Sequence, residues 1–151
     1  MTRFNPHPRA EDRKRSAVVL IELLLANKKP EVLPEHVREL LDTLLWKITE
    51  ADGKYKTRHQ SHAALACTDK GQLRHDHVYP RQRMIDALMK AKPEEVPGIV
   101  KDAVGCTVTI DEHRLLSTFD GKHEGWERYR KAKVAVTNTE TGEQEIFADS
   151  E

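Results

Sequence analysis

Three ionisable side chains stand side by side within residues 73–83, LRHDHVYPRQR, where apolar residues flank His75, Asp76 and His77. If this stretch forms a β-strand, alternation places the two imidazoles on one face and the carboxylate on the other. An H-x-H pair on one strand face is a ready bidentate metal site. A third ligand must come from another segment, and His113 is the best candidate because it begins a helix that follows a short predicted strand.

The segments DHVYP (76–80) and VTIDEHRLL (108–116) resemble the first and last parts of the ββα-metal finger of HNH endonucleases. The resemblance implies that Asp76 and His113 bind a divalent metal, which is Mg²⁺, Mn²⁺ or Zn²⁺. It also implies that His77 is the general base that activates water for attack on a phosphodiester. An imidazole suits this role because its ordinary pKa lies near neutral pH, while the cation polarises the phosphate. The H-x-H spacing adds His75 as a further candidate ligand.

Two other interpretations of these residues stay open. The family's usual asparagine has no counterpart between Asp76 and His113, which favours a degenerate finger that binds without cutting. Alternatively the residues are structural: Asp76 caps a turn or pairs with an arginine, and Glu112 and His113 occupy the first turn of a helix, where the dipole favours the acid.

Basic side chains predominate from residue 54 to residue 83, whereas the tail from residue 140 to residue 151 is acidic. The whole chain carries 25 basic and 25 acidic residues, so an anionic partner must meet a local patch. The predicted phosphate-facing residues are Lys54, Lys56, Arg58, Arg74, Arg81 and Arg83. Tyr55 could stack on a base between the first of these cations, and the alternative is a solvated basic loop.

The hydrophobic pattern predicts the elements that position these residues. A helix is expected over residues 12–28, and a second one begins at Pro34 and ends before Gly53, with apolar residues at the spacing of one helical face. Short helices are expected over residues 83–91 and from residue 93 onward. Thr109 and Glu112 have the spacing of a capping box, which predicts a strand that runs into a helix.

The expected fold class is α+β, with an N-terminal helical hairpin and further short helices packed against a small ββα-like element and a C-terminal β-hairpin. We expect a single domain over residues 1–151. Its parts are the helical hairpin (1–53), a basic connector (54–72), the HNH-like element (73–118), and a helical turn followed by a β-hairpin with an acidic tail (119–151).

Composition also bounds the location and the partners. Two cysteines, Cys67 and Cys106, are too few for a disulfide framework, which favours a reducing, cytoplasmic setting. The run AVVLIELLLA contains Glu22 and is too short to span a bilayer, so we expect no membrane partner. The same run has more apolar surface than one partner helix would cover, which predicts a homodimer.

Two functional hypotheses follow. The first is an HNH-like protein that acts on nucleic acid, either by metal-dependent phosphodiester hydrolysis or as a degenerate relative that only binds. The second is a small non-catalytic binding protein, such as a phage or mobile-element inhibitor or adaptor, that engages a protein partner through its acidic hairpin or basic loop. A small-molecule or nucleotide pocket between the helices and the basic loop is a third reading.

Overall fold

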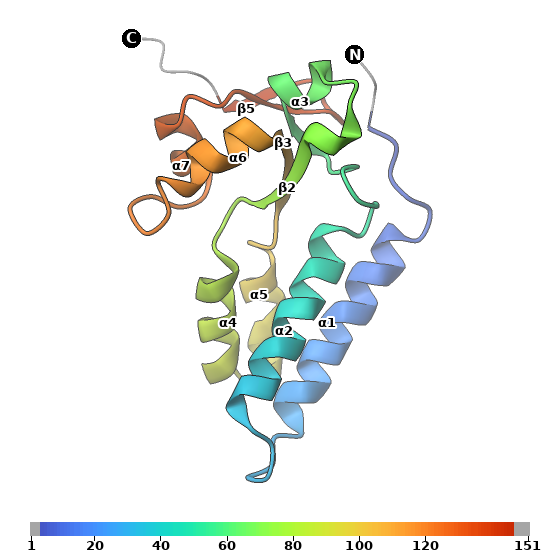
Figure 1. Ribbon diagram of the computed structural model, residues 1–151. Helices are drawn as coiled ribbons and strands as arrows, with labels where there is room; N and C mark the ends of the chain where they lie inside the picture. The colour runs from blue at the N-terminus through green and yellow to red at the C-terminus, as the bar shows by residue number, and fades with distance from the viewer. Residues whose placement is uncertain (1–3, 147–151) are drawn as a thin grey trace.

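A computed structural model describes residues 4–146 of the chain. Its architecture is α+β, as the sequence predicts. Figure 1 shows one lobe of helices, which lies below a second lobe that contains the sheet. Part of the predicted acidic tail, residues 147–151, lies outside the described residues. No helix within residues 4–146 is long and apolar enough to cross a membrane.

The helical lobe consists of four helices from two separate parts of the chain. The predicted hairpin is formed by α1 (Ala10–Ala26) and α2 (Pro34–Thr49), with proline in the first turn of α2. Two later helices, α4 (Arg81–Lys90) and α5 (Val96–Val100), pack on this hairpin, with α4 against α2 and α5 against α1. A 3-10 turn, Pro93–Glu95, joins them.

The sheet has the strand order β2-β3-β1-β4-β5. Its strands are β1 (His59–Ser61), β2 (Leu73–His77), β3 (Gly105–Thr109), β4 (Val136–Asn138) and β5 (Gln144–Ile146). β3 runs antiparallel to β2 and parallel to β1, and β4 runs antiparallel to both β1 and β5. The predicted C-terminal hairpin is therefore present as β4 and β5 at one edge of the sheet.

Helices α3 (His62–Ala66), α6 (Ile110–Ser117) and α7 (Trp126–Lys131) belong to this sheet lobe, as does a 3-10 turn at Lys70–Gln72. The capping box predicted at the start of α6 is present: the Thr109 hydroxyl accepts from the Glu112 amide, and the Glu112 carboxylate accepts from the Thr109 amide. Because α6 directly follows β3, the elements β2, β3 and α6 form a ββα arrangement, with α4 and α5 inserted between its strands.

The connector predicted over residues 54–72 holds a strand that the sequence pattern did not indicate. β1 has only three residues, His59–Ser61, yet it lies in the middle of the sheet between β3 and β4. Pairing on both sides, and not β-propensity, fixes it as a strand.

Each lobe has its own hydrophobic core. The helical core is built around Ile21, Leu41, Leu45 and Leu88, and the sheet core around Val108, Leu116, Tyr129 and Val136. The H-D-H strand, β2, lies where the two lobes meet, so its two faces meet different surroundings.

Candidate functional site

The pleat of β2 separates the predicted site residues, as alternation requires. His75 and His77 lie next to each other, with ring centroids 5.0 Å apart, and Asp76 points to the opposite face of the strand, toward Tyr129. Asp76 pairs with Cys106 of β3 in the register, so its side chain enters the sheet core. The three residues of the triplet therefore do not converge on one point.

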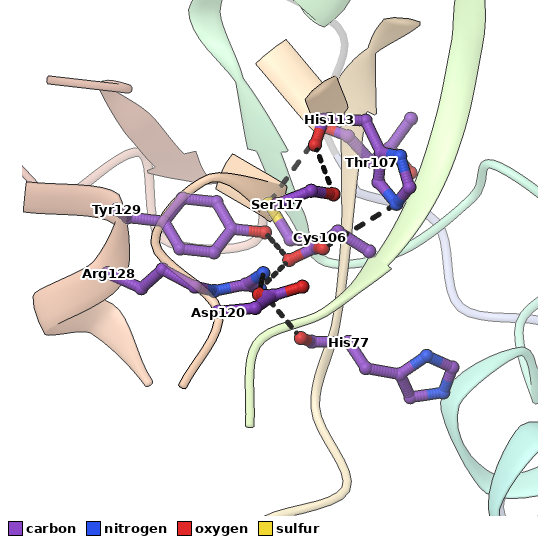
Figure 2. A network of polar contacts seen from close by, with 9 residues as sticks. His77, Cys106, Thr107, His113, Ser117, Asp120, Arg128 and Tyr129 are labelled. Atoms are coloured by element: carbon purple, nitrogen blue, oxygen red, sulfur yellow. Dashed lines mark hydrogen bonds and ion pairs between the residues drawn. The ribbon is translucent and has the colours of Figure 1, made fainter. Parts of the chain in front are cut away.

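On the core face, Asp76 is held by two residues of α7. Its side chain is buried, with 4% of its surface exposed, and one carboxylate oxygen accepts from the Arg128 guanidinium and from the Tyr129 hydroxyl, the latter at 2.5 Å. Arg128 also donates to the carbonyl of His77 at 2.8 Å and to Asp120 at 3.0 Å. Arg128 and Tyr129, which make these two contacts, are labelled in Figure 2.

The predicted partner His113 does reach Asp76. Its Nε2 lies 3.9 Å from the second carboxylate oxygen, and its side chain is 41% exposed, so α6 brings it to the site from the solvent side. The Ser117 hydroxyl donates to the His113 carbonyl at 2.9 Å. Asp76 and His113 are thus brought together, as the resemblance implies, while the ring of His77 points away from them.

Burial controls the protonation of this network. It raises the pKa of Asp76, and the Arg128 guanidinium, the Tyr129 hydroxyl and the His113 imidazole all oppose that rise because each stabilises the carboxylate. Burial would lower the pKa of Arg128, but Asp76, Tyr129 and Asp120 together outweigh it, and the pKa is raised. Burial also raises the pKa of the Cys106 thiol well above its ordinary value, so Cys106 is not a nucleophile.

On the other face, His75 and His77 contact α2. The Nε2 atoms of both rings lie beside the Thr49 hydroxyl, at 3.2 and 3.1 Å, and both rings contact Trp46, at centroid distances of 5.0 and 4.4 Å. Burial lowers the pKa of His75 to about 4 and that of His77 to about 3. Both imidazoles are therefore neutral at pH 7.

Gly105 allows β3 to pass close to His75. A Cβ atom at this position would lie 2.4 Å from Cε1 of the His75 ring and 3.3 Å from the Thr49 carbonyl. The first of these separations is shorter than carbon atoms tolerate, so any side chain here would displace the imidazole. The Nδ1 atom of His75 is buried and, among the described residues, has no hydrogen-bond partner.

The described residues do not fit the predicted metal centre. Within residues 4–146, no group of three or more His, Cys, Asp or Glu side chains is arranged to hold a metal ion. The Arg128 guanidinium already neutralises Asp76, and a divalent cation beside it would be repelled. His75 and His77 cannot complete the ligand set because they lie on the far face of the strand, so the geometry supplies no general base next to Asp76 and His113 either.

The predicted phosphate-facing residues divide into two groups. Arg58 pairs with Glu140, Arg81 with Asp42, and Arg83 with Asp102 and Glu124. The remaining three, Lys54, Lys56 and Arg74, form no ion pair in the part of the chain that the structure describes. Arg74 donates to the carbonyls of Gly71 and Leu73, and the Lys54 ammonium lies 5.1 Å from the centre of the Tyr55 ring.

A hollow of about 460 Å³ lies at the end of β2, between the two lobes. Arg81, which stacks over the Trp46 ring at 4.9 Å, lines one side of it, and Arg128 and Asp120 line the other. Both faces of the strand contribute to its wall. Its lining comprises Trp46, His75, Asp76, His77, Pro80, Arg81, His113, Asp120, Gly121 and Arg128.

Sequence reasoning did not find the two residues that contact Asp76 most closely. Arg128 and Tyr129 lie in a short helix for which only packing was expected, more than 50 residues away in the chain. The one available signal was Asp76 itself, an acid within a strand that has apolar neighbours. A buried carboxylate requires a cation or several hydrogen-bond donors, so a partner from another segment could have been expected.

Comparisons with protein-family models, with curated proteins and with solved structures found no match for this chain.

Proposed function

We propose that this protein binds nucleic acid through its ββα element and does not cut it. The observation that carries the proposal is the Arg128 guanidinium on Asp76, the position to which the HNH resemblance assigns a metal ligand. A fixed organic cation in this place keeps the carboxylate neutralised without a metal. The element can then meet phosphate through the exposed Arg74 and the partly exposed Arg81, while it lacks the means to activate water.

Two features support a nucleic-acid ligand. The guanidinium group of Arg81 lines the hollow at the end of β2 and stays one-third exposed in its ion pair with Asp42, and planar guanidinium groups can bind phosphate oxygens in a bidentate way. The Trp46 ring lies in the same hollow, where an unpaired base can stack on it. Arg74, on the strand that forms one wall, adds a cation that no carboxylate neutralises among the described residues.

The test is binding of fluorescently labelled single-stranded DNA, duplex DNA and RNA, measured by anisotropy in Mg²⁺ and in EDTA. We expect binding in both buffers, with a dissociation constant that rises as salt increases, because phosphate contacts release counterions. Arg81→Ala should weaken binding about tenfold, the loss expected for one guanidinium–phosphate contact. Arg15→Ala, which removes an exposed cation of α1 outside the hollow, is the matched control.

A plasmid incubated with the protein and Mg²⁺ or Mn²⁺ should stay intact. Metal-dependent cutting that disappears in His77→Ala would overturn the non-cutting proposal in favour of hydrolysis. Absence of binding to all three nucleic acids would overturn the proposal as a whole.

A further inference from the structure

The two hairpin helices leave large aliphatic side chains in water on the side away from α4 and α5. On α1, Val19, Leu20 and Leu23 are 46%, 47% and 53% exposed, and on α2 Leu40 is 51% exposed. The residues of the same helices that face the core, such as Ile21 and Leu41, are fully buried. We call the surface formed by Leu20, Leu23, Leu40 and Leu44 the outer hairpin face.

This surface is continuous and hollowed. A hollow of about 540 Å³ runs between α1 and α2 and includes Leu20, Leu44 and Lys47, and a second one of about 280 Å³ includes Leu20 and Leu23. Leu20 lines both, so the two hollows adjoin. Grooves beside protruding leucines are the surface that helices use to pack against other helices. A contiguous apolar surface of this kind is uncommon on a protein that has no partner.

The charges on α2 indicate which partner fits. Glu39 and Lys47 lie four residues on either side of Thr43, and all three side chains are exposed. Neither charged side chain has an ion-pair partner within residues 4–146. A second α2 running antiparallel about a two-fold axis at Thr43 would place each Glu39 opposite the Lys47 of the other copy. His36 and Glu50, seven residues on either side of Thr43, would face each other in the same way.

We propose that the outer hairpin face binds a second copy of this chain, so that two α1–α2 hairpins form an antiparallel four-helix arrangement. A two-fold interface must be complementary to itself, and opposite charges placed symmetrically about Thr43 meet that requirement. The leucines of both copies would fill the hollows between the helices, with the Glu39–Lys47 pairs on either side of the two-fold axis. The proposal does not depend on nucleic-acid binding, because the hollow at the end of β2 shares no lining residue with this face.

The experiment measures the mass of the whole protein by light scattering over a range of concentrations. The wild-type chain should approach twice its 17.3 kDa monomer mass as concentration rises. Leu23→Glu and Leu40→Glu should each raise the dimer dissociation constant about tenfold or more, as loss of a central contact does. Leu115→Glu is the matched control, because Leu115 is 45% exposed but lies on α6 in the other lobe.

A charge exchange tests the two-fold axis itself. Glu39→Lys and Lys47→Glu should each weaken the dimer, since each brings like charges together, and the double variant should restore it. At concentrations low enough for the wild type to be monomeric, the melting temperature of each variant should match the wild type, because every substituted side chain is exposed. A wild-type monomer at all concentrations, or a dimer unaffected by the leucine substitutions, would overturn the proposal. Failure of the double variant to restore the dimer would overturn the antiparallel arrangement.

Discussion

The two faces of β2 differ in how they accommodate ionisable side chains: one holds a charged pair and the other holds neutral imidazoles. On one face, Asp76 is buried together with the Arg128 cation and one further donor, the Tyr129 hydroxyl, so a carboxylate is kept inside the sheet core. On the other face, His75 and His77 are partly buried against Trp46 and Thr49, which lowers their pKa values and leaves both imidazoles neutral. The comparison teaches that residue type alone does not define a catalytic cluster: neighbouring residues in one strand can belong to two separate networks.

Removal of the Arg128 cation should have the largest effect on the free energy of unfolding. Arg128→Met leaves the Asp76 carboxylate buried without its charge partner, and we expect a loss of about 3–5 kcal/mol in the free energy of unfolding. Urea denaturation measures it. Arg130→Ala, which removes a half-exposed guanidinium of the same helix that pairs with Glu127, should cost at most about 1 kcal/mol. Equal losses in the two variants would show that Asp76 does not depend on Arg128.

Removal of the phenol hydroxyl should have the next largest effect. Tyr129→Phe keeps the buried ring but deletes the hydrogen bond to Asp76, and a bond to a charged group contributes about 1.5–3 kcal/mol. Thermal and urea unfolding of this variant should show the loss. Combining it with Asp76→Asn should cost less than the sum of the two single losses, because both substitutions act on the same hydrogen bond. Strict additivity would contradict the proposed contact.

The face of β2 that contains His75 and His77 is tested by adding a side chain at Gly105. Gly105→Ala puts a methyl group 2.4 Å from the His75 ring, and we expect a loss of about 1–3 kcal/mol from overpacking. Gly98→Ala is the matched control, because its Cβ meets no atom within 4 Å. The control should leave stability unchanged or raise it slightly. Stability should partly return in Gly105→Ala/His75→Ala if His75 is the group displaced.

The smallest effect should come from mild acid. Both histidines have lowered pKa values in the native state, about 4 and about 3, so between these values and about 6.5 only the unfolded chain binds their protons. The two neutral histidines contribute fully to the free energy of unfolding above about pH 6.5. This contribution declines as the pH falls, by about 1 kcal/mol between pH 7 and pH 6. Urea titrations at the two pH values measure it. His77→Gln should remove about half of the difference, and an unchanged difference would contradict the assignment.

The sequence was informative wherever one segment contains its own signal. The α1–α2 hairpin follows from leucine spacing, β2 from its alternation, and the start of α6 from the Thr109 and Glu112 capping box, and all are present. It also anticipated that Asp76 and His113 meet.

What could not be predicted depends on contacts between distant segments. β1 is three residues without a β-pattern, and it is a strand only because β3 and β4 pair with it. The contact between Asp76 and Arg128 spans 52 residues, so no local spacing could reveal it. For the same reason, His77 could not be assigned to the Trp46 face until α2 was placed beside the strand.

The insertion of α4 and α5 between β2 and β3 has a consequence for how the protein folds. Residues 78–104 separate two strands that pair directly, so this pairing closes a long loop and carries its entropic cost. If α4 and α5 first pack on the α1–α2 hairpin, most of residues 78–104 is already ordered, and pairing β2 with β3 then closes only the short segments that remain flexible. Folding should therefore begin in the helices, and the sheet should form late and exchange its amide hydrogens sooner than the helical core does. Neither lobe is a continuous piece of chain, so cutting the chain at residue 53 would separate α1 and α2 from five of the twelve buried residues of their core.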